Sequence, residues 1–157
     1  MKILLLVIGK TDEKYLIEGM DKYRKRLKHY IGFDYEAIPD LKNRKSLSEA
    51  QQKKLEADLI IAKLKAGDKL VLLDDKGKEF SSPAFSKHLQ LQMNSGIKRL
   101  VLVVGGPYGF DSSVYAKAQG KLSLSKMTFS HQMIRLFVLE QVYRAMTILK
   151  NEPYHHE

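Results

Sequence analysis

The sequence predicts an α/β fold, in which a mostly parallel β-sheet carries helices on both faces. Short apolar runs that suit buried strands alternate along the chain with longer segments of helical periodicity. The expected strands also end in glycine or small polar residues, at Gly9, 74–77, 105–109 and 123–130. Because parallel strands present their carboxyl ends at one edge of the sheet, we expect a ligand site along that edge.

The N-terminal part of the chain predicts a strand, a helix and a second strand. Residues 3–8 form a continuous apolar run, which is typical of a strand buried on both faces. Thr11 is expected to cap a helix that extends to about His29. The alternating segment FDYEAIP, residues 33–39, predicts a strand that ends at Pro39.

The next part predicts a loop, a helix and a third strand. The loop is the polar and basic segment DLKNRKS. Ser46 and Glu49 have the spacing of a capping box, so a helix is expected to begin there and to reach about Lys65, with Gly67 closing it. The apolar segment KLVLLD, residues 69–74, is the expected third strand.

A helix and a fourth strand are expected next. Ser82 and Pro83 suit the N-cap and first helical position of a helix that ends near Gly96. The segment KRLVLVVG, residues 98–105, predicts a buried strand. Asp111 can then cap a short helix.

The C-terminal part predicts a weaker strand and a long helix. The segment KLSLSKM, residues 121–127, alternates but carries serines. Ser130 is expected to start a helix that extends to about Lys150. The tail NEPYHHE, residues 151–157, is expected to have no structure of its own. The length of 157 residues fits a single domain spanning residues 1–157.

The long last helix carries two apolar stripes, whereas a surface helix of a monomer normally has one. The first stripe consists of Ile134, Phe137, Val138, Val142, Ala145 and Leu149, and the second of Leu136, Leu139, Tyr143 and Met146. We interpret this pattern as one face on the sheet and another on a second copy in a homodimer. The alternative is that a neighbouring helix of the same chain covers the second stripe.

Composition restricts the classes of partner and of chemistry. The chain has no cysteine, which excludes disulfides, thiolate metal sites and a cysteine nucleophile and is consistent with a cytoplasmic location. A net charge of +9 favours polyanionic partners, nucleic acid before acidic membranes, although it can also serve solubility alone. No apolar run approaches the ~20 residues that span a bilayer, and the apolar N-terminus lacks a cleavage pattern, so no membrane segment is expected.

The common catalytic and nucleotide-binding motifs are missing from the sequence. It contains neither a G-x-G-x-x-G fingerprint nor a G-x-x-x-x-G-K-[ST] loop, which disfavours a Rossmann-like enzyme that uses another nucleotide. Gly105 and Gly106 fit a tight turn and a ligand contact equally well. The sequence shows no nucleophile–base–acid triad. His88 and His131 are isolated in the sequence, so no metal site is expected.

Basic residues gather in three groups, interleaved in the first with Tyr23, His29 and Tyr30. Phosphate contacts by Lys and Arg, combined with aromatic stacking, are typical of RNA binding. Each group taken alone fits a solvated helix face equally well. The groups are Lys22, Arg24, Lys25, Arg26 and Lys28; Lys42, Arg44 and Lys45; and Lys53 and Lys54.

Four segments in order, LLDDKGKEFSSPAF, LVVGGPYGF, SLSKMTFSHQMIRLFVLEQVYRA and NEPYHHE, resemble one family along the whole chain. It is the SPOUT-class family that methylates N3 of a pseudouridine in large-subunit (23S) ribosomal RNA. The resemblance implies a C-terminal trefoil knot, an exception to the usual absence of threading. It also implies a homodimer and S-adenosylmethionine as the methyl donor, bound by Leu73, Gly105, Leu124, Ser125, Lys126, Met127, Thr128 and Phe129.

The implied reaction also needs a group that handles the proton on N3, whose pKa lies far above 7. His131, His155 and Tyr154 are candidate proton acceptors, and Arg135 is a candidate for stabilising charge on the ring oxygens. We expect the tail to close over the target base, and assembled ribosomal particles to be the substrate. The competing hypothesis is a non-catalytic RNA-binding module that acts in ribosome assembly.

Overall fold

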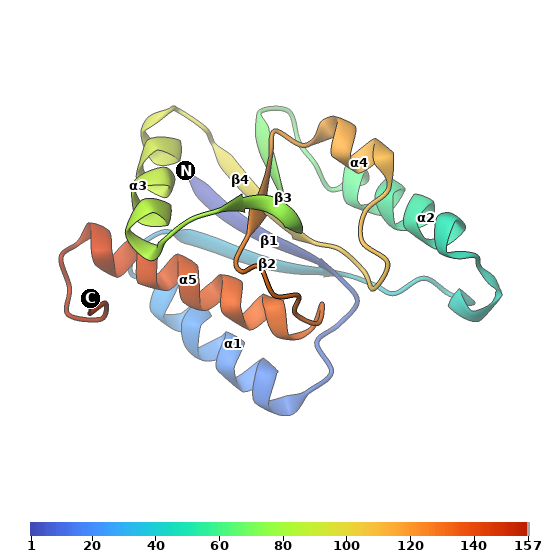
Figure 1. Cartoon of the computed structure of the whole chain (residues 1–157), viewed down its shortest axis with the longest axis horizontal. Helices are drawn as coiled ribbons and strands as arrows, with labels where there is room; N and C mark the ends of the chain where they lie inside the picture. The colour runs from blue at the N-terminus through green and yellow to red at the C-terminus, as the bar shows by residue number, and fades with distance from the viewer. Residues whose placement is uncertain (157) are drawn as a thin grey trace.

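The protein forms a five-stranded parallel sheet in the order β2-β1-β4-β3-β5 (Figure 1). A computed structural model describes residues 1–156. Strand and helix alternate along the chain, as the sequence predicts. The strands are β1 (Lys2–Ile8), β2 (Gly32–Ile38), β3 (Asp68–Glu79), β4 (Arg99–Val104) and β5 (Gly120–Ser123).

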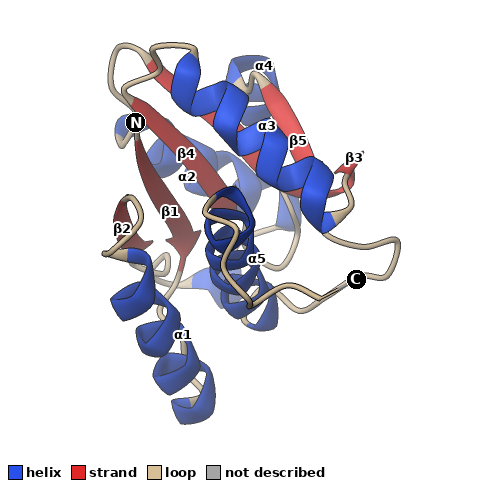
Figure 2. Cartoon of the chain, turned by 90° about the vertical axis from the view of Figure 1, so that its left-hand side faces the viewer, coloured by secondary structure: helices blue, strands red, loops and turns tan. Residues whose placement is uncertain are grey.

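Helices cover both faces of this sheet, which confirms the predicted fold class. On one face α1, α3 and α5 enclose the larger apolar core, and on the other α2 and α4 enclose the smaller one (Figures 1 and 2). The helices are α1 (Lys14–Leu27), the 3₁₀ turn η1 (Arg44–Ser46), α2 (Glu49–Ala62), α3 (Ser82–Asn94), α4 (Ser112–Lys117) and α5 (Met133–Leu149).

Both faces of the central strand β1 are buried, which explains its continuous apolar run. Ile3, Leu5 and Val7 point into the larger core, and the alternate residues Leu4 and Leu6 point into the smaller one. Successive side chains of a strand project to opposite faces, so both sets must be apolar in a strand covered by two helix layers.

Two predicted helix starts are wrong by a few residues. Thr11 does not cap α1; the N-cap position is Glu13, which makes no side-chain cap. The Thr11 hydroxyl instead accepts a hydrogen bond from Arg135, at 3.0 Å. The capping box of α2 is made by Ser48 and Gln51 rather than by Ser46 and Glu49, because Ser46 belongs to the preceding 3₁₀ turn. Several neighbouring hydroxyl residues can satisfy the same sequence rule.

The other helix starts lie closer to the prediction. Ser81 rather than Ser82 is the N-cap of α3, and its hydroxyl accepts from the N–H of Ala84 at 3.3 Å. Asp111 caps α4 as expected. Ser130 accepts from the N–H of Met133, although α5 itself begins at Met133.

The second apolar stripe of α5 is covered within the chain. Leu139 and Met146 are buried in the larger core, and the Tyr143 ring contacts Tyr23 of α1 and Tyr30, just beyond its C-terminal end, with centroids 5.8 and 5.6 Å apart. The interpretation of this stripe as a dimer surface is therefore wrong, and the alternative, a neighbouring helix, is correct. The homodimer and the trefoil knot stay predictions, since one chain and its strand pairing define neither.

The described part of the tail, residues 151–156, packs against the helices, contrary to expectation, and residue 157 lies outside the described residues. The hydroxyl of Tyr154 hydrogen-bonds to Glu140 of α5 and to Tyr23 of α1, and Tyr30 donates to Glu152. Polar side chains in the tail thus find partners that sequence proximity does not reveal.

Candidate functional site

A cavity of about 700 Å³ lies at the carboxyl edge of the sheet, where the strand-end residues predict a ligand site. Three segments form its walls: residues 73–76 of β3, residues 104–110 from the end of β4 onwards, and most of residues 122–131 from the end of β5 towards α5. Lys53 of α2, Tyr115 of α4 and Ile134 of α5 complete the lining. The volume falls in the usual range of small-molecule sites, about 300–1,000 Å³.

The first wall exists because β3 leaves the sheet and returns to it. Leu122 of β5 pairs with both Leu73 and Lys78, so the residues between them arc away from the sheet. Gly77 lets the chain return: a Cβ atom there would lie 2.5 Å from the carbonyl carbon of Leu122. The arc places Asp74 at the cavity.

The second wall contains the glycine pair after β4, and the structure shows the close packing that was one of its two expected reasons. At Gly105 a Cβ atom would lie 3.2 Å from the ring of Phe110, and at Gly106 one would lie 2.5 Å from Oε2 of Glu56. The missing side chains therefore make room for the protein's own atoms, as close packing in a tight turn requires, and both glycines also line the cavity. The loop closes where the N–H of Gly109 donates to the carbonyl of Gly106, at 3.1 Å.

The third wall is a segment held by two serines. The Ser123 hydroxyl donates to the carbonyl of Ser125 at 2.8 Å, and the N–H of Met127 donates to the Ser125 hydroxyl at 2.9 Å. The ring centroids of Phe129 and Phe137 lie 4.8 Å apart, so this segment packs against α5. The strand expected over residues 121–127 ends at Ser123 because the chain turns here.

Comparison with known proteins identifies the family. The family described as "Predicted SPOUT methyltransferase" matches residues 1–155. The chain belongs to the SPOUT methyltransferase family. Methyltransferases of this family use S-adenosylmethionine as the methyl donor.

Similar proteins match the chain over its whole length. "Ribosomal RNA large subunit methyltransferase H" of Parabacteroides distasonis is 64% identical over 157 residues, and that of Flavobacterium johnsoniae is 62% identical, each covering 100% of both chains. That of Porphyromonas gingivalis is 54% identical over the same length. A solved structure, a probable methylase family protein from Haemophilus influenzae, shares the fold at a TM-score of 0.53 and 11% identity, over 99% of this chain and 70% of that one.

The cavity of this SPOUT protein gathers most of the residues that the resemblance assigns to the donor. Lys126 is the exception, since it is exposed and lies outside the cavity lining. The donor-binding roles themselves stay predictions. The predicted donor residues that line the cavity are Leu73, Gly105, Leu124, Ser125, Met127, Thr128 and Phe129.

Asp74 places a carboxylate in the cavity lining, which also contains Asp75, Lys53 and Lys76. Burial opposes its ionisation, but hydrogen bonds from Tyr115 and from the N–H of Lys76, together with the charge of Lys121, hold its pKa below the usual value. Burial and the contact with Asp74 raise the pKa of Tyr115 to about 12, so this phenol stays protonated and donates. A carboxylate at this wall suits a cationic ligand, and S-adenosylmethionine carries a sulfonium.

His131 also lines the cavity, at the start of the connection to α5. Burial lowers its pKa, and the nearby charge of Arg135 lowers it further. The imidazole is therefore largely neutral at pH 7. A neutral imidazole at the cavity can accept a proton, as the prediction for this residue requires.

Arg135 lies elsewhere than predicted. Its side chain is fully buried and donates to the carbonyls of Ile8, Gly9 and His131 and to the Thr11 hydroxyl, over 2.6–3.0 Å. It thereby holds the end of β1 against the start of α5. We therefore assign it a structural role, and the hypothesis that its guanidinium contacts the target base does not fit this position.

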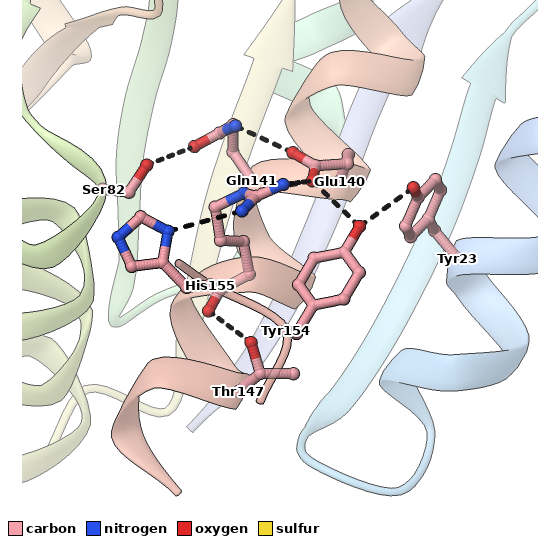
Figure 3. A network of polar contacts seen from close by, with 8 residues as sticks. Tyr23, Ser82, Glu140, Gln141, Thr147, Tyr154 and His155 are labelled. Atoms are coloured by element: carbon pink, nitrogen blue, oxygen red, sulfur yellow. Dashed lines mark hydrogen bonds and ion pairs between the residues drawn. The ribbon is translucent and has the colours of Figure 1, made fainter. Parts of the chain in front are cut away.

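The tail residues Tyr154 and His155 lie outside the cavity lining, beside the middle of α5 (Figure 3). Nδ1 of His155 is 3.3 Å from the Arg144 guanidinium. Burial and hydrogen bonds to Tyr23 and Glu140 raise the pKa of Tyr154, so in this position its phenol is no base. Within one chain, the structure does not bring these tail residues to the cavity.

The sequence interpretation missed three polar residues of the site. Tyr115 and Lys53 line the cavity, and Glu56 lies behind the glycine pair. Their proximity depends on how α2 and α4 pack on the sheet. The sequence offers no signal for Glu56, which is one of several charged residues of α2 and whose burial appears only in the structure.

Two features are absent from residues 1–156. No helix in this range is both long and apolar enough to cross a lipid bilayer. The same residues contain no group of three or more His, Asp or Glu side chains placed to hold a metal ion.

Proposed function

We propose that this protein transfers the methyl group of S-adenosylmethionine to N3 of a pseudouridine in large-subunit ribosomal RNA. The observation that carries the proposal is the 700 Å³ cavity of a SPOUT chain, lined by seven of the eight predicted donor residues and by His131. Relatives that are 54–64% identical over the full length are named large-subunit rRNA methyltransferases. This function places the protein in the cytoplasm, where ribosomes are.

The cavity fits the proposed donor in both shape and charge. Leu73 and Phe129 offer apolar walls, and the main chain from Leu124 to Phe129 offers hydrogen-bonding groups. Asp74 offers a carboxylate to the positively charged sulfonium of the donor. The donor supplies an activated methyl group on sulfur. The protein therefore needs to position two reactants and to accept one proton, which explains why no nucleophile is required.

His131 has the properties of the proton acceptor. Its pKa is lowered, it lies at the cavity, and Gln132 holds the adjoining chain by donating from Nε2 to the carbonyl of Lys10 at 3.0 Å. His131 would take the N3 proton and so free the nitrogen lone pair, and the donor would supply the methyl group, with its sulfur as the leaving group. Arg135 contributes by fixing the carbonyl of His131.

A basic surface beside the cavity is proposed to hold the rRNA. Lys53 lines the cavity, and the exposed Lys42, Arg44 and Lys45 lie in and just before the 3₁₀ turn η1, near enough for the charge of Arg44 to act on His131. The basic residues near the end of α1 lie at the opposite end of the molecule, so the three groups do not form one surface. Phosphate contacts need only exposed cations near the target, and the η1 group meets this requirement.

A homodimer is part of the proposal, because the tail lies away from the cavity of its own chain. Met127 and Phe137 are apolar and exposed beside the cavity, with 77% and 39% of their surfaces accessible. In a dimer, the partner's tail can reach this mouth and close over the base. Light scattering of the purified protein should give twice the chain mass.

The function is tested by two measurements. Mass spectrometry of large-subunit rRNA from a strain that lacks the gene should show one pseudouridine without its methyl group, restored by the wild-type gene. Isothermal titration should show binding of S-adenosylmethionine. An unchanged rRNA contradicts the proposed reaction, and absence of donor binding instead favours a non-catalytic RNA-binding module.

A further inference from the structure

Helix α2 buries two polar side chains where apolar residues are usual. Gln52 and Glu56, one turn apart, are 4% and 3% exposed. Nε2 of Gln52 donates to Oε1 of Glu56 at 2.9 Å. A buried carboxyl group is costly, so it persists where a specific contact uses it. Neither residue lines the cavity, and the proposed reaction does not use them.

The carboxyl group of Glu56 lies directly behind Gly106. A Cβ atom at position 106 would lie 2.5 Å from Oε2 and 2.8 Å from Oε1. Gly106 does not have a positive φ, so its backbone conformation does not require glycine. The contact with Glu56 is therefore the reason for glycine at this position.

Gly106 in turn sets the loop that forms the second wall of the cavity. It pairs with Gly109 in an isolated antiparallel bridge, and residues 105–109 all line the cavity. Pro107, Tyr108 and Gly109 are exposed, so the packing that fixes the loop is concentrated at its base. Any movement of Gly106 is passed to the surface that meets the donor.

We propose that Glu56 is a positioning residue for the methyl donor: through its contact with Gly106, it fixes the loop 105–109 that forms one wall of the cavity. This inference rests on the proposed function, since it concerns the donor of that reaction. Glu56 touches neither reactant, and its effect on the donor passes through the loop.

The surroundings indicate that Glu56 acts by shape and hydrogen bonding. Burial raises its pKa, the hydrogen bond from Gln52 lowers it, Asp40 raises it and Arg44 lowers it, with a net increase. Glutamine has nearly the same shape and keeps a carbonyl oxygen towards Gln52. We therefore expect Glu56→Gln to preserve the loop and Glu56→Ala to release it.

The test uses the full chain and four variants: E56Q, E56A, G106A and the double variant E56A/G106A. Titration calorimetry gives Kd for S-adenosylmethionine, methyl transfer to ribosomal particles gives kcat and KM, and thermal unfolding reports folding. D58A is the matched control, because Asp58 is an exposed acidic residue of the same helix with 59% of its side chain accessible.

We expect E56Q and D58A to bind the donor as the wild type does. E56A and G106A should each raise the donor Kd about tenfold, equal to ~1.4 kcal/mol, with a smaller change in kcat. In the double variant the added methyl group enters the space that the carboxyl group leaves. The fold-increase of its donor Kd over the wild type should then be smaller than the product of the fold-increases in the two single variants. Such non-additivity is the signature of a direct contact.

Three results would overturn the inference while the wild type still binds the donor and methylates rRNA. They are wild-type donor affinity in G106A, single effects that simply multiply in the double variant, and a loss of thermal stability in E56A with unchanged Kd. If the wild type itself binds no donor, the proposed function fails first, and the inference fails with it.

Discussion

The hydroxyl of Tyr154 in the tail donates a hydrogen bond to Glu140 of α5, at 3.0 Å, and lies 3.1 Å from the hydroxyl of Tyr23 of α1 (Figure 3). The guanidinium of Arg144 stacks over the Tyr154 ring, 4.8 Å from its centroid. These contacts give the tail a defined position against its own helices. In that position it leaves the mouth of the cavity open to RNA.

Removing the tail should therefore separate donor binding from methyl transfer. Truncation after Asn151 leaves every cavity-lining residue in place, so Kd for S-adenosylmethionine should stay within about twofold of the wild type. If the tail orders the target base, methyl transfer should fall by about 100-fold or more. Titration calorimetry and methylation of ribosomal particles measure the two effects.

A matched variant controls for the loss of stability. Tyr154→Phe keeps the ring but loses the hydrogen bonds to Glu140 and Tyr23, at a cost of about 1 kcal/mol in unfolding free energy. Wild-type methylation by the truncated protein would remove the tail from the mechanism. Loss of donor binding on truncation would instead assign the tail to the donor site.

His131 should set the acid limit of the reaction. Because burial and Arg135 lower its pKa, the base stays neutral until the pH falls below 6.5, the usual value for histidine. The acid limb of kcat/KM should therefore lie below pH 6.5. His131→Gln should lose this limb and about 10²–10⁴-fold in rate. A pH–rate profile of both proteins decides, and an unchanged limb in the variant would exclude His131 as the proton acceptor.

The same shift affects stability, with a defined sign. The folded state binds the His131 proton less readily than the unfolded chain does. The unfolded state therefore takes up more protons as the pH falls through 6.5, and the free energy of unfolding decreases. His131→Gln removes this contribution, so the slope of stability against pH between 7 and 5 should become shallower, as measured by urea unfolding.

Asp74 should distinguish the methyl donor from its product. S-adenosylmethionine carries a sulfonium charge that S-adenosylhomocysteine lacks, and the pKa of Asp74 is lowered, so this side chain is ionised at pH 7. Asp74→Asn keeps an acceptor for Tyr115 but removes the charge. The donor Kd should rise about two- to fivefold, equal to ~0.4–1 kcal/mol, and the product Kd should change less.

Calorimetry with both ligands measures this difference, and Asp58→Asn on the exposed face of α2 is the control. Equal weakening of donor and product would show that Asp74 acts through Tyr115 and the shape of the wall. The charge of Asp74 would then have no part in selecting the donor.

Local patterns predicted the edge of the sheet at which the cavity lies. Apolar runs report burial, and the carboxyl ends of parallel strands must share an edge, so Leu73, Gly105 and the segment after Ser123 could be brought together without coordinates. The same reasoning failed for the second stripe of α5. Periodicity shows that Leu139 and Met146 are buried, but it does not show which segment covers them.

Arg135 and Glu56 show a second limit. Arg135 was a candidate for stabilising charge on the target base, yet its long side chain turns inward to the carbonyls of Ile8 and Gly9 at the end of β1. Glu56 had no local signal for its contact with Gly106. Both positions depend on the packing of distant segments, which local sequence patterns do not report.

The return of β3 at Gly77 predicts a sharp sensitivity to one methyl group. A Cβ atom at position 77 would lie 2.5 Å from the carbonyl carbon of Leu122 and 2.7 Å from the nitrogen of Ser123. These are backbone atoms of β5, which cannot rotate away as the end of a side chain can. Gly77→Ala should therefore lower the unfolding free energy by about 1–3 kcal/mol or more.

Gly120→Ala is the matched control, because it lies in β5 itself and its Cβ would meet only a methyl group of Val71, at 3.7 Å. Its stability should stay within about 0.5 kcal/mol of the wild type. Ser123 leads directly into residues 124–129, which are predicted to bind the donor. Gly77→Ala should therefore weaken donor binding in the fraction of the variant that still folds. Unfolding in urea and donor titration of both variants test this prediction. Equal stability of the two variants would show that Gly77 does not approach the backbone of β5 closely.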